Sequence, residues 1–271
     1  MKVDVVIPFH PKDIDTLPWC IEGIRSNLPA SRVLVIGSAA SRPLLEKYDI
    51  EFVDEDAVIP GLKLSSHSGK RWGWYFQQIL KLGIADHVTT DHYLAVDADT
   101  VFLRKTPLFS ASGKPLYATS ESIDHHKPYF EGFERLMGFQ AEREYSFVVH
   151  HMLFNKQRVS EMREMFTGGP PWYAAIINRM NQGLPFSEYE TYGHYLKHKY
   201  PDDFELRQLR WSDIWILPTR RLIGRLATCY DFCAFHAHFR EKPLGRLQRA
   251  AIRFKIERRI VRHRLRSCLK R

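Results

Sequence analysis

The order of apolar runs and amphipathic segments predicts an α/β fold built on a parallel sheet. Residues 2–8, 32–36 and 50–53 are short runs rich in Val and Ile, which is typical of buried strands. Residues 13–28 place apolar side chains at helical spacing, and residues 43–48 form a shorter helical segment. A strand-helix-strand-helix-strand order favours parallel strands with helices on the faces of the sheet.

The next segments continue this alternation. Residues 64–69 read as a loop, and residues 70–86 carry an apolar stripe that predicts a helix leading into a buried strand at 93–96. Ser187 is placed to cap a later helix. The remaining expected elements are strands at 117–120 and 147–154, helices at 155–166, 172–181 and 186–200, and strand-like runs at 211–218 and 229–238.

Composition indicates a globular cytosolic protein. The 271 residues are 44% hydrophobic, enough for one large domain with a core. No stretch approaches the ~20 apolar residues of a membrane span. The first residues enter a strand directly, so we expect no signal peptide. The 4 cysteines are scattered, which favours a reduced cytoplasmic compartment over a disulfide framework.

The positive charge belongs to the last 28 residues. Residues 244–271 hold 11 of the 40 Lys and Arg residues and one of the 31 acids, so residues 1–243 are nearly neutral. We therefore expect a domain over 1–243 and a basic amphipathic helical tail over 244–271. One apolar line of that helix comprises Leu247, Ala250, Ala251, Phe254, Val261, Leu265 and Leu269, and a shorter line comprises Ile252, Ile256 and Ile260.

Such a helix suits an anionic membrane surface. We expect the protein to be peripheral at the inner face of the cell membrane. The alternative is that the apolar residues pack on the domain and the basic residues are only solvated.

Two carboxylates, Asp97 and Asp99, follow the buried strand at 93–96, with Ala98 between them. A buried pair of like charges is costly unless a cation lies between them. A divalent metal is the natural candidate, because hard cations bind carboxylate oxygens and leave positions open for substrate phosphates. The alternative is a polar turn after a strand.

Ligands of parallel α/β sheets bind where the strands end. The residues at those ends are Pro8, Phe9, His10, the acidic run that begins at Asp54, and the Asp97–Asp99 motif. Arg71, Gln78 and Lys81 lie on the helix before the motif, where each could face either the site or solvent.

The chain resembles the GT-A glycosyltransferases, which use a mid-chain DxD motif to hold a divalent ion against a nucleotide-sugar diphosphate. Its patterns (VIPFHPKD, GWYFQQILKLG, VDADTVFL, HHMLFN and SEYETYG) are similar to a family of bacterial GT-A-type proteins associated with surface polysaccharide. The late stretch FHAHFREKPLG looks like the ending of glycogenin-type retaining transferases. Two features of that ending, a Gly inside it and a Trp after the proline, are absent here.

This resemblance implies a single GT-A domain with a mixed central sheet, and a role for each motif. Asp97, Asp99 and His236 would bind Mn²⁺ or Mg²⁺, with His238 as the competing histidine, and Lys242 would meet the diphosphate. Glu188 or Glu190 would be the acceptor-side base in an inverting reaction, or would position the sugar in a retaining one. The donor is expected to be a UDP-sugar and the acceptor a glycan or lipid-linked glycan. The expected donor-side residues are Pro8, Phe9, His10, Asp54, Arg71, Gln78, Lys81, Asp97, Ala98 and Lys242.

Three other functions fit parts of the sequence. An aspartyl-phosphate phosphatase would use Asp97 as its nucleophile, but that family places the nucleophile after the first strand, and no later paired-aspartate motif is evident. A zinc hydrolase would use His125, His126, His150 and His151, but adjacent histidines in a strand point to opposite faces, and no HExxH motif occurs. A nucleic-acid binder acting through the tail is disfavoured by the neutral body and by the lack of a known module.

Overall fold

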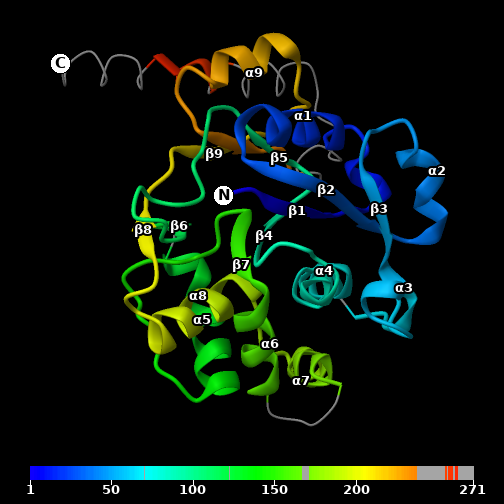
Figure 1. The fold of residues 1–271 in the computed structure, drawn as a ribbon, viewed down its shortest axis with the longest axis vertical. Helices are drawn as coiled ribbons and strands as arrows, with labels where there is room; N and C mark the ends of the chain where they lie inside the picture. Colours follow the sequence, from blue (N-terminus) through cyan, green and yellow to red (C-terminus); the bar gives the residue numbers. More distant parts are fainter. Residues whose placement is uncertain are drawn as a thin grey trace. The chain divides into compact units, whose positions relative to one another are not determined.

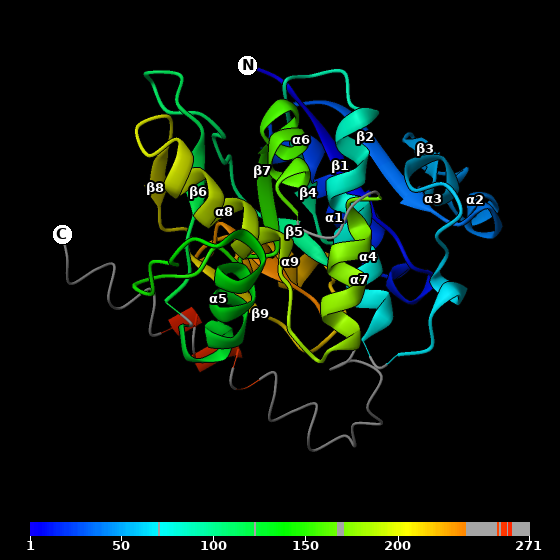
Figure 2. The same ribbon diagram turned by 90° about the horizontal axis from the view of Figure 1, so that it is seen from below.

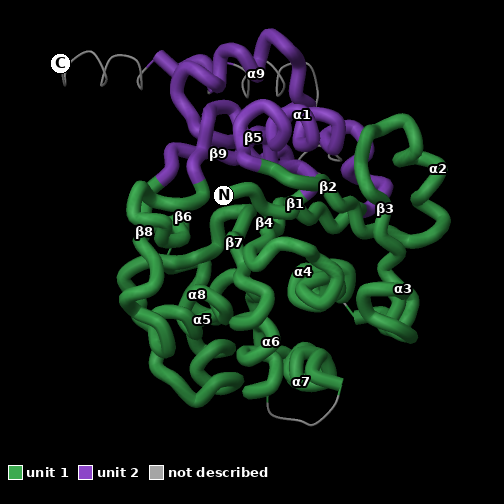
Figure 3. Tube along the Cα trace, viewed as in Figure 1, with its two compact units in different colours: residues 1–9, 30–97, 108–208 green, residues 10–29, 98–107, 209–271 purple. Residues whose placement is uncertain are grey.

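The protein forms two compact units, each assembled from segments that are far apart in the sequence (Figure 3). The computed structural model describes residues 1–69, 71–121, 123–166, 171–236, 254, 256–258 and 260–261. Unit 1 contains residues 1–9, 30–97 and 108–208, and unit 2 contains residues 10–29, 98–107 and 209–271.

Unit 1 is built on a five-stranded mixed sheet with the strand order β3-β2-β1-β4-β7 (Figure 1). The first four strands are mutually parallel, and β7 is antiparallel to β4, with Val96 opposite His151. The strands are β1 (Val3–Pro8), β2 (Ala30–Gly37), β3 (Glu51–Asp54), β4 (His92–Val96) and β7 (His151–Asn155). The sheet confirms the predicted α/β fold with a mixed central sheet.

The helices of unit 1 gather against this sheet. Helices α4, α6 and α8 lie along it, while α5 packs on α8 and α7 packs on α4 (Figure 2). The helices are α2 (Arg42–Leu45), α3 (Glu55–Val58), α4 (Trp72–Gly83), α5 (Ile123–Met137), α6 (Lys156–Glu164), α7 (Tyr173–Asn181) and α8 (Glu188–Lys199). Short 3₁₀ turns occupy Ala39–Ser41, Leu64–Ser66 and Ile84–Asp86, and β6 (Leu116–Ala118) pairs in parallel with β8 (Glu205–Arg207).

Helix α8 begins as predicted, because the Ser187 side chain accepts a hydrogen bond from the backbone N–H of Glu190. Every residue from Glu188 to Leu196 is buried. The helix touches β7 and the loop before it so closely that a Cβ on Gly193 would lie 2.2 Å from the Phe147 ring. Because this buried part of the helix carries two glutamates, those charges need protein partners.

Unit 2 contains a three-stranded sheet with the order β5-β10-β9. Strand β10 (Phe232–Ala234) is antiparallel to β5 (Thr100–Phe102) and parallel to β9 (Trp211–Asp213). Helix α1 (Leu17–Asn27) packs directly on β5, and a Cβ on Gly23 would lie 2.8 Å from the carbonyl oxygen of Phe102. A 3₁₀ turn at Pro11–Asp13 and helix α9 (Arg220–Leu226) also belong to the described part of this unit.

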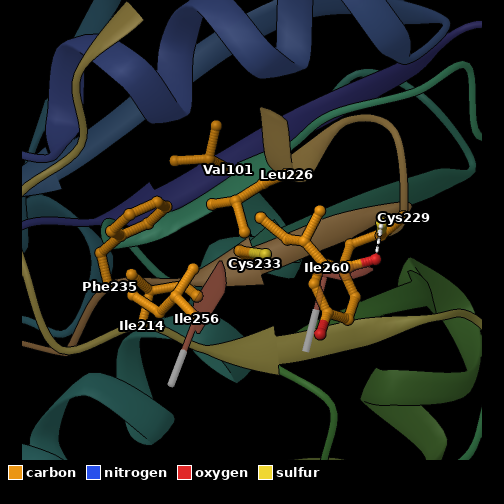
Figure 4. Packing of buried hydrophobic residues seen from close by; sticks show 9 residues of the cluster. Val101, Ile214, Leu226, Cys229, Cys233, Phe235, Ile256 and Ile260 are labelled. Carbon is orange, nitrogen blue, oxygen red and sulfur yellow. Dashed lines mark hydrogen bonds between the residues drawn. The ribbon is translucent and has the colours of Figure 1, made fainter. Parts of the chain in front are cut away.

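Two tail residues, Ile256 and Ile260, are part of the apolar core of unit 2. They are 8% and 1% exposed and belong to a cluster with Leu226, Cys229 and Cys233 (Figure 4). The other members of the cluster are Val101, Ile214, Tyr230 and Phe235. The shorter apolar line predicted in the tail therefore packs on the protein at its two described positions.

The longer apolar line of the tail is exposed to solvent at its two described positions. Phe254 is 62% exposed and Val261 is 52% exposed. The other members of this line, together with Ile252, lie outside the described residues.

Several elements differ from the sequence prediction. The strand expected at 147–154 pairs with β4 only from His151 to Asn155, because the residues before it form a loop fastened to α8. The loop expected at 64–69 contains a 3₁₀ turn, and α3, α5, α9, β5 and β8 were not predicted. No helix among the described residues has the length and hydrophobicity to cross a membrane.

Candidate functional site

Three side chains that could bind a metal ion lie close together in unit 2: the predicted Asp99 and His236, and Asp213. His236 Nε2 lies 2.8 Å from Asp213 Oδ1, and His236 Nδ1 lies 3.3 Å from Asp99 Oδ2. The sheet register explains the meeting, because Ala234 of β10 lies beside both Thr100 of β5 and Asp213 of β9. The backbone N–H of Phe235 also donates to the carbonyl oxygen of Asp99 at 2.8 Å.

The electrostatics of this group favour a positive charge between the two carboxylates. Burial alone would lower the pKa of His236, but the hydrogen bonds and negative charges of Asp213 and Asp99 raise that pKa to about 10. The imidazole is therefore a cation at neutral pH and balances its two neighbours.

Part of this donor set also fits a divalent cation, which would displace the extra proton from His236. Asp213 Oδ1 and His236 Nε2 are oxygen and nitrogen ligands of the kind that Mn²⁺ accepts, and both residues are placed to hold an ion, whereas Asp99 lies at the other imidazole nitrogen. Asp213 was not predicted as a metal ligand. It is the last residue of β9 and lies within the strand-like run expected at 211–218.

A second charged group lies inside unit 1. The ammonium of Lys81 donates to Asp97 Oδ1 at 2.6 Å, to Glu188 Oε1 at 2.7 Å and to the Tyr189 hydroxyl at 2.9 Å. It also lies 4.3 Å from the centroid of the Tyr189 ring. The side chains of Lys81 and Glu188 are each 3% exposed, and that of Asp97 is 22% exposed. One buried cation therefore joins the first motif carboxylate to the start of α8.

Burial and neighbouring charges shift the pKa values of Lys81, Asp97 and Glu188 in opposite directions. Burial alone would lower the pKa of Lys81, but the Asp97 and Glu188 charges hold it well above its usual range. Burial would raise the pKa of Asp97, but Lys81 and a hydrogen bond from His150 hold it far below its usual value. Burial raises the pKa of Glu188, and the charge of Lys81 only partly offsets this effect.

Glu190 has a different set of partners. Its Oε2 accepts the backbone N–H of Phe147 at 2.9 Å and lies 3.5 Å from His194 Nε2. Its Oε1 makes no hydrogen bond to any described residue, and the side chain is fully buried. Both predicted acceptor-side acids are therefore enclosed by protein, and Glu190 fastens the loop before β7 to α8.

The predicted donor-side residues of the helix before the motif are divided between the interior and the surface. Gln78 is 1% exposed, and its Oε1 accepts the backbone N–H of Glu188 at 2.9 Å, so it supports the start of α8. Arg71 is exposed, with its guanidinium 4.2 Å from the Trp74 ring centroid and hydrogen-bonded to the Tyr129 hydroxyl at 3.0 Å.

The remaining predicted residues lie at strand ends or outside the described part. Pro8 ends β1, and the backbone N–H of Phe9 donates to the carbonyl oxygen of Ile36. Asp54 caps α3 by accepting the backbone N–H of Asp56 at 3.0 Å, while His10 and Ala98 belong to unit 2. Lys242 and His238 lie outside the described residues.

Comparisons with known proteins place the chain as follows. A model described as a family of unknown function (DUF6492) matches residues 37–209. A search of curated proteins found no match.

Solved structures of glycosyltransferases are similar at low identity. WbbM, a bifunctional glycosyltransferase in its apo form, has 13% identity and a TM-score of 0.49, covering 86% of this chain and 45% of WbbM. The galactosyltransferase LgtC with donor and acceptor sugar analogues has 16% identity and a TM-score of 0.48, covering 96% of each chain. Mouse xyloside xylosyltransferase 1 in its apo form has 12% identity and a TM-score of 0.46, covering 90% of this chain and 100% of that one. Since each TM-score lies below 0.5, these likenesses assign no activity to this chain.

Proposed function

This chain belongs to DUF6492, a family of unknown function, and we propose that it is a metal-dependent glycosyltransferase of the hexosyltransferase type. It would move a sugar from a nucleotide-diphosphate sugar, most simply a UDP-sugar, to a glycan or lipid-linked glycan in cell-surface polysaccharide synthesis. One observation carries this proposal. Asp99 of the DxD motif and His236 near the Lys-Pro ending, which are far apart in the sequence, lie 3.3 Å apart in unit 2.

The proposed cation is Mn²⁺ or Mg²⁺. Asp99, Asp213 and His236 would hold it, and the resemblance of the motif adds Asp97. When bound, it would offset the negative charge that develops on the leaving nucleotide diphosphate. Lys242, which follows His236 in the Lys-Pro ending, would add a positive charge to the same group.

Unit 1 supplies the second set of proposed residues. Lys81 would hold Asp97 in place, and Gln78 would support Glu188 at the start of α8. The contacts of Glu188 and Glu190 favour a role in setting the positions of Lys81 and of the loop before β7 over direct contact with an acceptor. Arg71 presents an exposed guanidinium that suits a phosphate. The remaining donor-side proposals are Pro8, Phe9, His10, Asp54 and Ala98.

Calorimetry with UDP, in the presence and absence of Mn²⁺, tests this proposal. We expect tight binding only with Mn²⁺, and we expect Asp99→Asn to lose that dependence because it removes a charged ligand. Asp124→Asn is the matched control, since the Asp124 side chain is 89% exposed and pairs with a neighbouring lysine on its own helix. Equal affinity for UDP with and without Mn²⁺ would refute the metal-dependent mechanism.

We also propose that the basic tail attaches the enzyme to an anionic membrane, where a lipid-linked acceptor would be found. The exposed positions of Phe254 and Val261 support this proposal, and each nearby basic residue would add about 1 kcal/mol. A Phe254→Glu/Val261→Glu double variant should sediment less with phosphatidylglycerol vesicles than the wild type. Salt should weaken the binding of both proteins. Equal sedimentation of the two proteins, or equal binding to phosphatidylcholine vesicles, would contradict attachment through this face.

A further inference from the structure

His150 has an unusual backbone conformation beside the DxD motif. Its φ is 63°, and Arg71 is the only other non-glycine residue of the described part with a positive φ. Residues with a Cβ rarely adopt this left-handed region, although histidine does so more often than most. Such residues cluster at functional sites when the surrounding structure imposes the conformation.

The surrounding structure does impose this conformation. Ser146 forms an antiparallel bridge with Ser120. Phe147 donates its backbone N–H to the buried carboxylate of Glu190, and its ring packs against the backbone at Gly193. After His150, the chain enters β7 at His151. The loop is thus fastened at both ends, and His150 must turn within the few residues between these points.

This turn brings both the backbone and the side chain of His150 to Asp97. The carbonyl oxygen of His150 accepts the backbone N–H of Asp97 at 3.1 Å. Its Nδ1 lies 3.5 Å from Asp97 Oδ2, while Lys81 donates to Asp97 Oδ1 at 2.6 Å. Each carboxylate oxygen therefore has its own cationic or hydrogen-bonding neighbour. The His150 side chain is 15% exposed, so the contact is largely shielded from water.

We propose that His150 is a positioning residue that, together with Lys81, sets the orientation of the Asp97 carboxylate for binding a divalent cation with a nucleoside diphosphate. This inference rests on the proposed function. Hydrogen-bonding partners of ligand carboxylates change metal affinity by about 10- to 100-fold. A histidine in the loop before β7 can act in this way only if its left-handed backbone is maintained, and Glu190 provides that restraint from α8.

The substitution His150→Gly separates the functional role from a structural one. Glycine adopts a positive φ without steric cost, so the thermal midpoint should stay close to that of the wild type. The imidazole is lost, so Mn²⁺-dependent affinity for UDP should fall about 10-fold or more. His150→Asn, which tolerates the same backbone and keeps a short hydrogen-bond donor, should recover part of the affinity. His87→Ala removes an exposed histidine elsewhere in unit 1 and should leave both measurements unchanged.

Calorimetry of UDP binding with and without Mn²⁺, alongside thermal unfolding of each variant, distinguishes the outcomes. Loss of affinity at an unchanged thermal midpoint supports the inference. If the wild type is metal-dependent and His150→Gly binds equally well, the inference fails while the proposed function stands. If affinity and thermal midpoint fall together, His150 is structural, and the inference fails again. If the wild type binds UDP without regard to Mn²⁺, the proposed function and the inference both fail.

Discussion

Replacing Lys81 with methionine should destabilise unit 1 strongly, and more at high pH than at low pH. Methionine has a similar length and fills the same space, but it leaves Asp97 and Glu188 without their shared cation. Removing one partner of a buried ion pair lowers the free energy of unfolding by about 3–5 kcal/mol. Glu188 is 3% exposed and should account for most of this cost, whereas Asp97 at 22% exposure can recover some hydration.

The pH dependence follows from the two carboxylates. In the Lys81→Met variant, burial without a cation raises the pKa of both groups above their unfolded values of about 3.9 and 4.3. A group whose folded-state pKa is raised contributes stability that is present below the unfolded pKa and is lost as pH rises through the folded pKa. The loss of unfolding free energy relative to the wild type should therefore be larger at about pH 8 than at about pH 5.

Urea unfolding at both pH values, followed by circular dichroism, measures this effect. Adding Glu188→Gln to Lys81→Met should restore at least about 1 kcal/mol, because it removes one unpaired charge and keeps the shape. Lys127→Met is the matched control, since it breaks an exposed pair with Asp124 and should cause no measurable loss. A loss below about 1 kcal/mol at both pH values, or an equal loss at both, would refute the reasoning.

Three further predictions concern the metal site, the tail and α8. Asp99→Asn should abolish sugar transfer and weaken Mn²⁺ binding at least about 10-fold, and wild-type turnover by this variant would contradict the metal role. Ile260→Ala should lower the free energy of unfolding in urea by about 2–4 kcal/mol because Ile260 is 1% exposed. Val261→Ala, at an exposed position, should lower it by under about 0.5 kcal/mol. Similar losses in the two variants would contradict the packing of the tail. Gly193→Ala should lower unfolding free energy by about 1–3 kcal/mol, since its Cβ would collide with the Phe147 ring, and a neutral effect would mean that the ring moves aside.

The middle strands of the central sheet of unit 1 could be predicted because they are buried on both faces and are therefore nearly continuous apolar runs. β1 and β4 show this most clearly. Helix α5 was not predicted, since Pro128 and several charged residues interrupt its apolar pattern, and its burial comes from packing on α8. β8 and β5 are three residues long, so they carry too little periodicity to be recognised.

The site was predictable where residue type alone pointed to it, as for Asp99 and His236. The contacts between distant segments were not predictable, because periodicity describes only neighbours along the chain. Lys81 was expected near a diphosphate, and its pairing with Glu188 depends on how α4 meets α8. His150 attracted attention only as one of two adjacent histidines, since a left-handed φ has no marker in the sequence other than a mild preference for the residue type.

Because unit 2 is assembled from separate segments of the chain, its parts are synthesised at widely different times during translation. Strand β5 is synthesised near residue 100, but both β9 and β10 are made more than a hundred residues later, and Ile256 and Ile260 emerge last of the core residues. Until β10 has been synthesised, β5 has no strand partner within its own unit, which leaves an open edge that other chains can join. A nascent chain that stalls near Gln208 would carry a complete set of unit 1 segments beside an unfinished unit 2. Because the tail supplies the final residues of this core, we expect chaperones to bind the chain during translation and C-terminally shortened proteins to be poorly soluble.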